Sequence, residues 1–307
     1  MQVVVVTGAA GLVGQNLIPR LKSQFRIVAV DKHAHNVGVL RKLHPDIEVI
    51  EADMAEAGNW EDRVTQADAV IALQAQIGGL DPEPFHRNNV LSTERLIAAA
   101  KRGERPYLVQ VSSSVVRSAA CDLYTESKKA QETLALKSGL EHVILRPTLM
   151  FGWFDRKHLG WLRRFMERTP VFPIPGSGDY LRQPLYAGDF AAIIASSLER
   201  RTQGIYNISG LERVTYVQMI RMIKQTVGAK TAIVHIPYAA FWTLLKVYSW
   251  FDKNPPFTTL QLQALVTPDV FEEIDWPALF DVQRTPLERA LEETFLDPTY
   301  SHVALEF

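Results

Sequence analysis

The most constraining feature of this sequence is a regular alternation of short apolar runs with segments of helical length, beginning at Val3. The runs are rich in β-branched residues and read VVVVT, RIVAVD, IEVIEAD, DAVIAL, YLVQVSS and HVILRP. Segments such as Gly11 to Lys22 and Asn89 to Arg102 separate them. Strands that are apolar on both faces are typical of a parallel sheet covered by helices on both sides. We therefore expect the α/β class with a doubly wound parallel sheet.

A glycine run follows the first expected strand and opens a helix. Gly8, Gly11 and Gly14 would let the backbone turn tightly and approach a pyrophosphate at the helix start. An ordinary glycine turn would read the same, but Asp31 ends the next strand about 20 residues on, where a carboxylate accepts from ribose hydroxyls. Asp31 would also repel a 2′-phosphate. We therefore expect NAD, with NADP less favoured but left open by Lys32 and His33.

Further cofactor contacts are expected around this turn. Asp53 ends the third strand and could meet the adenine edge, although a helix N-cap is an equal alternative. The other residues expected to line the cofactor are Leu12, Val13, Met54, Leu73, Tyr124, Lys128 and Pro147.

The composition of the chain changes after Pro147, where proline and glycine cluster in TPVFPIPGSGDYLRQP. We expect a dinucleotide-binding Rossmann domain over residues 1–170 and a smaller substrate-binding domain over residues 171–307. Residues 184–202 are expected to return to the first domain, because an alanine-rich helical segment there follows the strand-like LYAGD.

Composition excludes several classes of function. The 307 residues are 47% hydrophobic with a net charge of -1, which fits a globular protein with a small-molecule substrate and no field for nucleic acid. The single cysteine, Cys121, fits a reducing compartment. The opening MQVVVVTGAAGLVG reads as a buried strand rather than a secretion signal, so we expect a cytoplasmic protein. The longest apolar stretch is broken by Lys246, so no transmembrane segment is expected.

Tyr124 and Lys128 stand four residues apart in the helical segment YTESKKAQETLALKSG, which places them on one face. An ammonium beside a phenol would lower the pKa of the tyrosine from about 10 and make it an acid/base group. The expected strand before this helix ends in three serines, Ser112 to Ser114, whose hydroxyls could bind a substrate oxygen. A solvated helical face is the alternative, but the position favours catalysis.

These residues carry a resemblance. TGAAGLVG, NNVLSTERLI, VSSS, YTESK, LRPTLMFG and RQPLYAGDFA occur in the order found in the NAD-dependent epimerase/dehydratase family, the extended short-chain dehydrogenases, which the chain resembles to about residue 210. The resemblance implies the following roles: Ser114 binds the reacting hydroxyl, Tyr124 is the acid/base, Lys128 holds the nicotinamide ribose, Pro147 lies beside the nicotinamide, Asn89 lies near the substrate, and Arg182 approaches a substrate diphosphate.

The resemblance implies an NAD-dependent epimerase or oxidoreductase acting on a hydroxyl or keto carbon of a nucleotide sugar. Three departures qualify it: the stretch between Ser114 and Tyr124 is short, LQAQ replaces a histidine and alanines, and Ser-Ser-Ser-Val replaces the carboxylates of dehydratases. Dehydration is therefore not expected. A ketoreductase or dehydrogenase on a non-nucleotide substrate is one alternative. A non-catalytic dinucleotide-binding subunit is another, because the tail PPFTTLQLQALVTPDVFEEIDW is similar to relatives of a complex I accessory subunit.

The remaining features have structural interpretations. We expect Cys121 to be a bystander, and no metal site is expected at His33 and His35. The aromatic run from Phe241 to Phe251 is expected to be core, with a subunit contact as the alternative. By the resemblance, a homodimer is possible.

Overall fold

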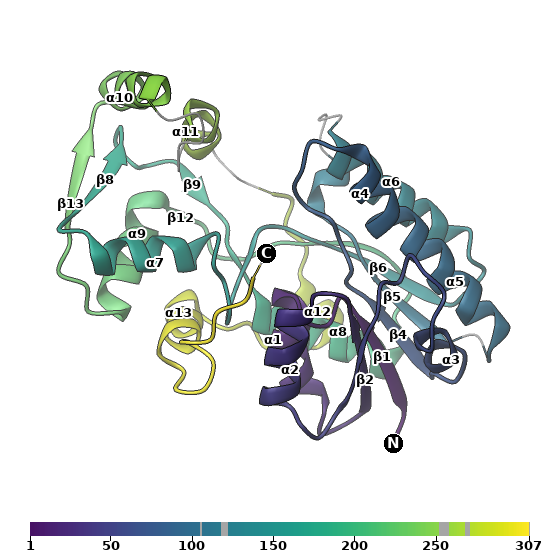
Figure 1. Ribbon diagram of the computed structural model, residues 1–307. Helices are drawn as coiled ribbons and strands as arrows, with labels where there is room; N and C mark the ends of the chain where they lie inside the picture. The colour runs from purple at the N-terminus through teal and green to yellow at the C-terminus, as the bar shows by residue number, and fades with distance from the viewer. Residues whose placement is uncertain (105, 118–121, 252–257, 268–270, 307) are drawn as a thin grey trace.

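Seven parallel strands form a single sheet with helices on both of its faces (Figure 1). The computed structural model describes residues 1–104, 106–117, 122–251, 258–267 and 271–306, so Cys121 lies outside the described residues. The sheet has the order β11-β6-β5-β4-β1-β2-β3. Its strands are β1 (Val3–Thr7), β2 (Arg26–Asp31), β3 (Glu48–Glu51), β4 (Ala69–Ala72), β5 (Tyr107–Val111), β6 (His142–Pro147) and β11 (Gly204–Ile208). The six runs of the sequence are the first six strands, and the doubly wound fold is confirmed.

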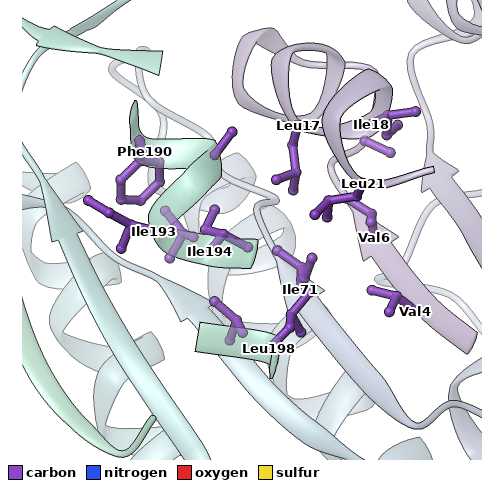
Figure 2. Close-up of a cluster of buried hydrophobic side chains, with 14 of the residues drawn as sticks. Val4, Val6, Leu17, Ile18, Leu21, Ile71, Phe190, Ile193, Ile194 and Leu198 are labelled. Carbon is purple, nitrogen blue, oxygen red and sulfur yellow. The ribbon is translucent and has the colours of Figure 1, made fainter. Parts of the chain in front are cut away.

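Alternate residues of each strand enter different hydrophobic cores. Val4 and Val6 of β1 pack on one face of the sheet, whereas Val5 packs on the other. The first core is closed by α1 (Leu12–Leu21), α2 (Ala34–Leu43) and α8 (Ala187–Arg200), and the second by α3 (Trp60–Thr65), α5 (Ser92–Arg102) and α6 (Leu123–Leu136). Figure 2 shows the first core, in which side chains of α1 and α8 meet over the strands.

Two late segments complete the sheet and its core. β11 pairs in parallel with β6, from Gly204 opposite Val143 to Ile208 opposite Pro147. α12 (Trp276–Phe280) adds Trp276 to the first core. Neither β11 nor α12 was predicted, because each is five residues long and stands outside the regular alternation. The division of the chain at residue 170 stays a prediction.

The rest of the second half builds its own core. α7 (Leu159–Arg168), α9 (Tyr216–Thr226) and α13 (Leu287–Leu296) share one hydrophobic cluster. β8 (Val171–Pro175) pairs in parallel with β13 (Ala232–Ile236). Two-residue strands make two further pairs: β7 (Met150–Phe151) with β10 (Leu185–Tyr186), and β9 (Leu181–Arg182) with β12 (Val214–Thr215). α10 (Tyr238–Phe251) and α11 (Thr259–Val266) lie beside each other at the outer end (Figure 1).

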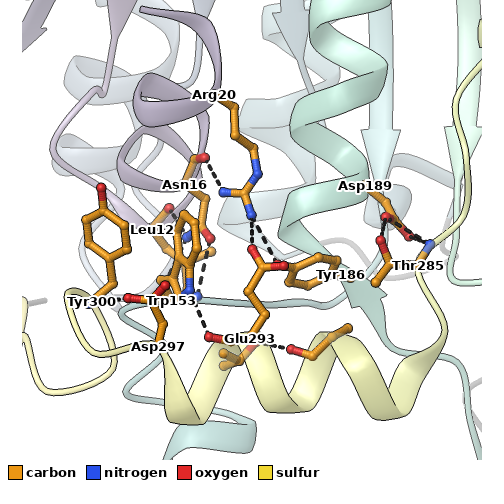
Figure 3. Close-up of polar contacts among 12 residues, drawn as sticks. Leu12, Asn16, Arg20, Trp153, Tyr186, Asp189, Thr285, Glu293, Asp297 and Tyr300 are labelled. Atoms are coloured by element: carbon orange, nitrogen blue, oxygen red, sulfur yellow. Dashed lines mark hydrogen bonds and ion pairs between the residues drawn. The ribbon is translucent and has the colours of Figure 1, made fainter.

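A polar cluster around Arg20 joins α13 to α1 (Figure 3). The Arg20 guanidinium donates to the Asn16 carbonyl at 2.7 Å and to the Tyr186 hydroxyl at 3.0 Å, and it forms an ion pair with Glu293. It also lies 4.1 Å from the ring centre of Trp153, whose indole N–H donates to the Glu293 carbonyl at 2.9 Å. These contacts fix the second half of the chain against α1.

The aromatic run forms α10, but the expectation that it is core is wrong for Trp242, Tyr248 and Trp250. Trp250 is 74% exposed, and Trp242 and Tyr248 are about half as exposed. Within the described chain, α11 is the main helix in contact with α10, so much of its surface has no covering layer. Among the described residues, no helix is both long and apolar enough to span a bilayer.

We predict that Ile194→Ala lowers the free energy of unfolding by roughly 2–5 kcal/mol, because it leaves a cavity between α8 and the sheet. Ile194 is fully buried. Urea unfolding measures the change. The control is Ile205→Ala on the exposed side of β11, which should change the free energy by less than about 1 kcal/mol; equal losses would contradict this view of the core.

Candidate active site

The glycine turn after β1 depends on two close approaches. Gly8 has φ +64°, and a Cβ there would lie 2.6 Å from the backbone nitrogen of Gln74. A Cβ on Gly14 would lie 2.3 Å from the Ala9 carbonyl oxygen. Gly11 is the N-cap of α1 and offers no side chain to its amides. The amides of the first turn, which includes Leu12 and Val13, are therefore available to a pyrophosphate, so the turn fits a dinucleotide.

Asp31 is held beside this turn. One carboxylate oxygen accepts from the Ala10 amide at 2.9 Å and the other from the His33 amide at 3.0 Å. The neighbouring ammonium of Lys32 is directed elsewhere, to the side chains of Asn88 at 2.5 Å and Asp53 at 3.4 Å. The carboxylate is thus fixed at the end of β2, where we expect the adenosine ribose, and Lys32 is engaged by other partners.

Asp53 lies in a cluster of opposite charges. Burial disfavours its charged form, but the Ala55 amide and the cations Lys32 and Arg87 outweigh it and lower the pKa of the carboxyl. The Arg87 guanidinium lies 3.1 Å from the carboxylate. Asp53 is not a helix N-cap, because α3 begins later, at Trp60. Its side chain instead accepts from the Ala55 amide in a turn. Met54 is buried and Leu73 half-buried at the ends of β3 and β4, and their cofactor contacts stay predictions.

Lys128 is a buried cation on α6, the helix whose N-terminus is capped by Asp122. Only 2% of Lys128 is exposed, and its ammonium donates to the Val111 carbonyl at 2.9 Å and to the Gln131 side-chain oxygen at 2.6 Å. Burial lowers the pKa of Lys128 to about 7, although the charge of Glu132 works in the opposite direction. Sequence reasoning missed Gln131; its position three residues after Lys128 was the available signal.

Tyr124 stands one helical turn before Lys128. Burial raises the pKa of its phenol above the usual value, a hydrogen bond with the Ser113 hydroxyl opposes this, and the charge of Asp122 adds to it. The expectation that Lys128 lowers the pKa of Tyr124 is therefore wrong in this structure, because the ammonium is directed at Val111 and Gln131 instead. The phenol is consequently protonated at neutral pH.

The three serines after β5 have different surroundings. Ser113 contacts Tyr124, whereas Ser114 is half-buried at the start of the short 3-10 helix η2 (Ser114–Arg117). The buried hydroxyls of Ser112 and Thr148 have no hydrogen-bond partner among the described residues. Ser112 follows β5 and Thr148 follows β6, at the edge of the sheet where one end of a bound cofactor would lie. Their free hydroxyls could therefore hydrogen-bond a polar group of a ligand. Pro147, the last residue of β6, is buried beside them; its contact with the nicotinamide and the role of Ser114 stay predictions.

Asn89 and Arg182 are both engaged by protein partners. Asn89, in the π-helical turn η1 (His86–Leu91), is fully buried. It accepts from the Gln76 amide at 2.6 Å and donates to the Ser127 hydroxyl at 2.8 Å. The Arg182 guanidinium donates to the Thr267 carbonyl at 2.9 Å and to that of Leu265 at the end of α11. In this structure Asn89 fixes the loop after β4, and Arg182 caps a helix. Their contacts with substrate stay predictions.

We predict that Gly8→Ala weakens NAD affinity at least about tenfold, because the new Cβ would force apart the turns after β1 and β4. Isothermal titration with NAD measures this. Gly38→Ala is the control, since nothing lies within 4 Å of a Cβ there; it should leave the affinity unchanged. Unaltered binding by the Gly8 variant would contradict the assignment of the turn.

We also predict a pH-dependent gain from Lys128→Met. With a pKa of about 7 in the fold, wild-type Lys128 is charged below that pH in both states, so the cost of burial is fully present there. Between pH 7 and about 10 the folded lysine is neutral and the unfolded one still charged, so the wild type gains stability with pH.

The stability advantage of the methionine variant over the wild type should therefore shrink by on the order of 2 kcal/mol between pH 7 and 9. Urea unfolding at several pH values tests this. Lys129→Met, on the partly exposed neighbour whose side chain is paired with Glu126, is the control and should show no such trend. Parallel curves for wild type and Lys128→Met would exclude a buried charge.

The chain is similar to several known proteins. The model of the NAD dependent epimerase/dehydratase family matches residues 4–209. A ceramide reductase of Caulobacter vibrioides is 26% identical, over 76% of this chain and 74% of that protein. A 4-hydroxy-2-methyl-3-oxo-4-farnesyl-3,4-dihydroquinoline-1-oxide ketoreductase of Stigmatella aurantiaca is also 26% identical, over 76% of each chain.

Among solved structures, a UDP-N-acetylglucosamine 4-epimerase of Methanobrevibacter ruminantium shares the fold, with a TM-score of 0.74 and 18% identity over 95% of this chain and 96% of that one. The family match covers the glycine turn, Tyr124 and Lys128. The chain therefore belongs to the NAD dependent epimerase/dehydratase family and is an NAD-dependent enzyme of the extended short-chain dehydrogenase/reductase type.

Proposed function

We propose that the protein is a ketoreductase that interconverts a ketone and a secondary alcohol. The observation that carries this is the protonated, half-buried Tyr124, hydrogen-bonded to Ser113, with the Lys128 ammonium one helical turn away. A tyrosine that keeps its proton at neutral pH is suited to act as a general acid, which reduction of a carbonyl requires.

Each residue has a defined task in this proposal. A bound NADH would be the source of the hydride for the carbonyl carbon. Tyr124 donates its proton to the carbonyl oxygen, and Ser113 orients both the phenol and that oxygen. Lys128 uses two of its three ammonium hydrogens on Val111 and Gln131, which leaves one for a ribose hydroxyl. In the oxidative direction Tyr124 takes the proton back.

We propose a lipophilic substrate in place of the nucleotide sugar expected from the sequence. Two sequence relatives are named for a ceramide and for a farnesylated quinoline oxide, both lipophilic molecules. Arg182, the residue expected at a substrate diphosphate, is directed at the carbonyls that end α11. The solved epimerase shares only the fold at 18% identity, so its UDP-sugar carries less weight for the substrate.

Tyr124→Phe tests the reaction. It keeps the ring but removes the proton donor, so the rate of NADH oxidation with a long-chain ketone in detergent should fall by about 10²- to 10⁴-fold. NAD affinity should change far less than the rate. Tyr206→Phe, on β11 away from the site, is the matched control. Retained turnover in the Tyr124 variant would contradict the mechanism.

The substrate class is tested separately. Wild-type protein is assayed with long-chain ketones and with UDP-sugars, following both NADH oxidation and sugar epimerisation. Turnover of UDP-sugars alone would overturn the lipophilic substrate and support the epimerase. Binding of NAD without turnover of either class would favour a non-catalytic dinucleotide-binding subunit.

A further inference from the structure

We propose that Gln131 is a positioning residue for Lys128, and that Thr93 imposes the orientation of its amide. This rests on the proposed role of Lys128 in the active site. Gln131 and Thr93 are both fully buried, on α6 and α5 respectively. Neither belongs to the residues expected at the site from the sequence.

The hydrogen-bond directions around Thr93 admit one arrangement. The Thr93 hydroxyl lies 2.7 Å from the Asn89 carbonyl oxygen, which can only accept, so the single hydroxyl hydrogen is directed there. Its oxygen must then accept from Gln131, whose side-chain nitrogen lies 2.9 Å away. The Gln131 amide consequently presents its oxygen, not its nitrogen, to the Lys128 ammonium at 2.6 Å.

The same hydroxyl also accepts from the side chain of Gln74, at 3.3 Å. The Gln74 side-chain oxygen in turn accepts from the hydroxyl of Thr7, the last residue of β1. Gln74 also lies against the glycine turn, because its backbone nitrogen is the atom that a Cβ on Gly8 would meet. A chain of hydrogen bonds therefore runs from the end of β1 to Lys128, joining the turn expected to hold the pyrophosphate to the lysine expected to hold the ribose.

The acceptor matters because other charges near Lys128 are already paired. Glu132 on the same helix forms a double hydrogen bond with Arg146 of β6, at 2.8 and 2.6 Å. Tyr124, one turn earlier, is neutral. Thus the Gln131 oxygen and the Val111 carbonyl are the direct acceptors that stabilise the ammonium within the described structure. Without Gln131, a smaller fraction of Lys128 would be charged at neutral pH.

The test is the titration of Lys128 in the cofactor-free protein, followed by the NMR shift of its ¹³C-labelled Cε. The signal is assigned by its loss in Lys128→Met. Gln131→Leu should lower the pKa of Lys128 by about one unit, and the isosteric Gln131→Glu should raise it. Thr93→Val, which frees the Gln131 amide, should lower it by less, and Thr93→Ser should restore it.

Affinity for NAD supplies a second readout. If only the charged lysine binds the ribose, a one-unit fall in pKa weakens affinity about tenfold at pH 8 and about twofold at pH 6. Ser138→Ala, which removes a buried hydroxyl at the end of the same helix, controls for loss of stability alone and should shift neither readout. A Lys128 titration that is unchanged in both Gln131 variants would overturn the proposal. Because the titration needs neither substrate nor turnover, it stands or falls independently of the ketoreductase assignment.

Discussion

The position of β1 in the sheet determines where everything else in the site can lie. From β1 the chain winds outward to β2 and β3, then crosses to β4 on the other side and continues to β5, β6 and β11. Parallel strands bring their carboxyl ends to one edge, and a crevice opens where the winding reverses. The turn after β1 and the loop after β4 meet there, and the missing Cβ of Gly8 lets them approach. The glycine turn and the loop after β4 therefore meet where the winding of the sheet reverses.

Burying the cation of Lys128 imposes an electrostatic cost on this arrangement. Lys128 gives up its hydration, and two oxygens from β5 and α6 replace part of it. The nearest carboxylate, Glu132, is committed to Arg146. The result is a lysine that titrates near neutrality beside a tyrosine that stays protonated. Both states follow from burial, and both suit a site in which proton transfer accompanies delivery of hydride.

A feature of the fold or the site could be predicted from the sequence when it depends on residues that are close together in the chain. Each of the six strands and the glycine turn is determined by a short stretch of sequence, and the structure forms all of them at the expected positions. The Gln131–Thr93 contact joins two helices, and the choice of Ser113 as the partner of Tyr124 depends on the turn into η2; neither leaves a local pattern. α10 is helical as its sequence suggests, but its exposure depends on what packs against it, which an apolar run does not encode.

The late arrival of β11 has a consequence for synthesis on the ribosome. Until residue 208 has left the exit tunnel, β6 is an open edge strand, because Val143 to Pro147 lack their partners in β11. The apolar face above it stays uncovered still longer, because Trp276 and Phe280 emerge some seventy residues later. The nascent chain therefore carries an incomplete sheet through much of its translation, and that interval is when edge-to-edge association would compete with folding.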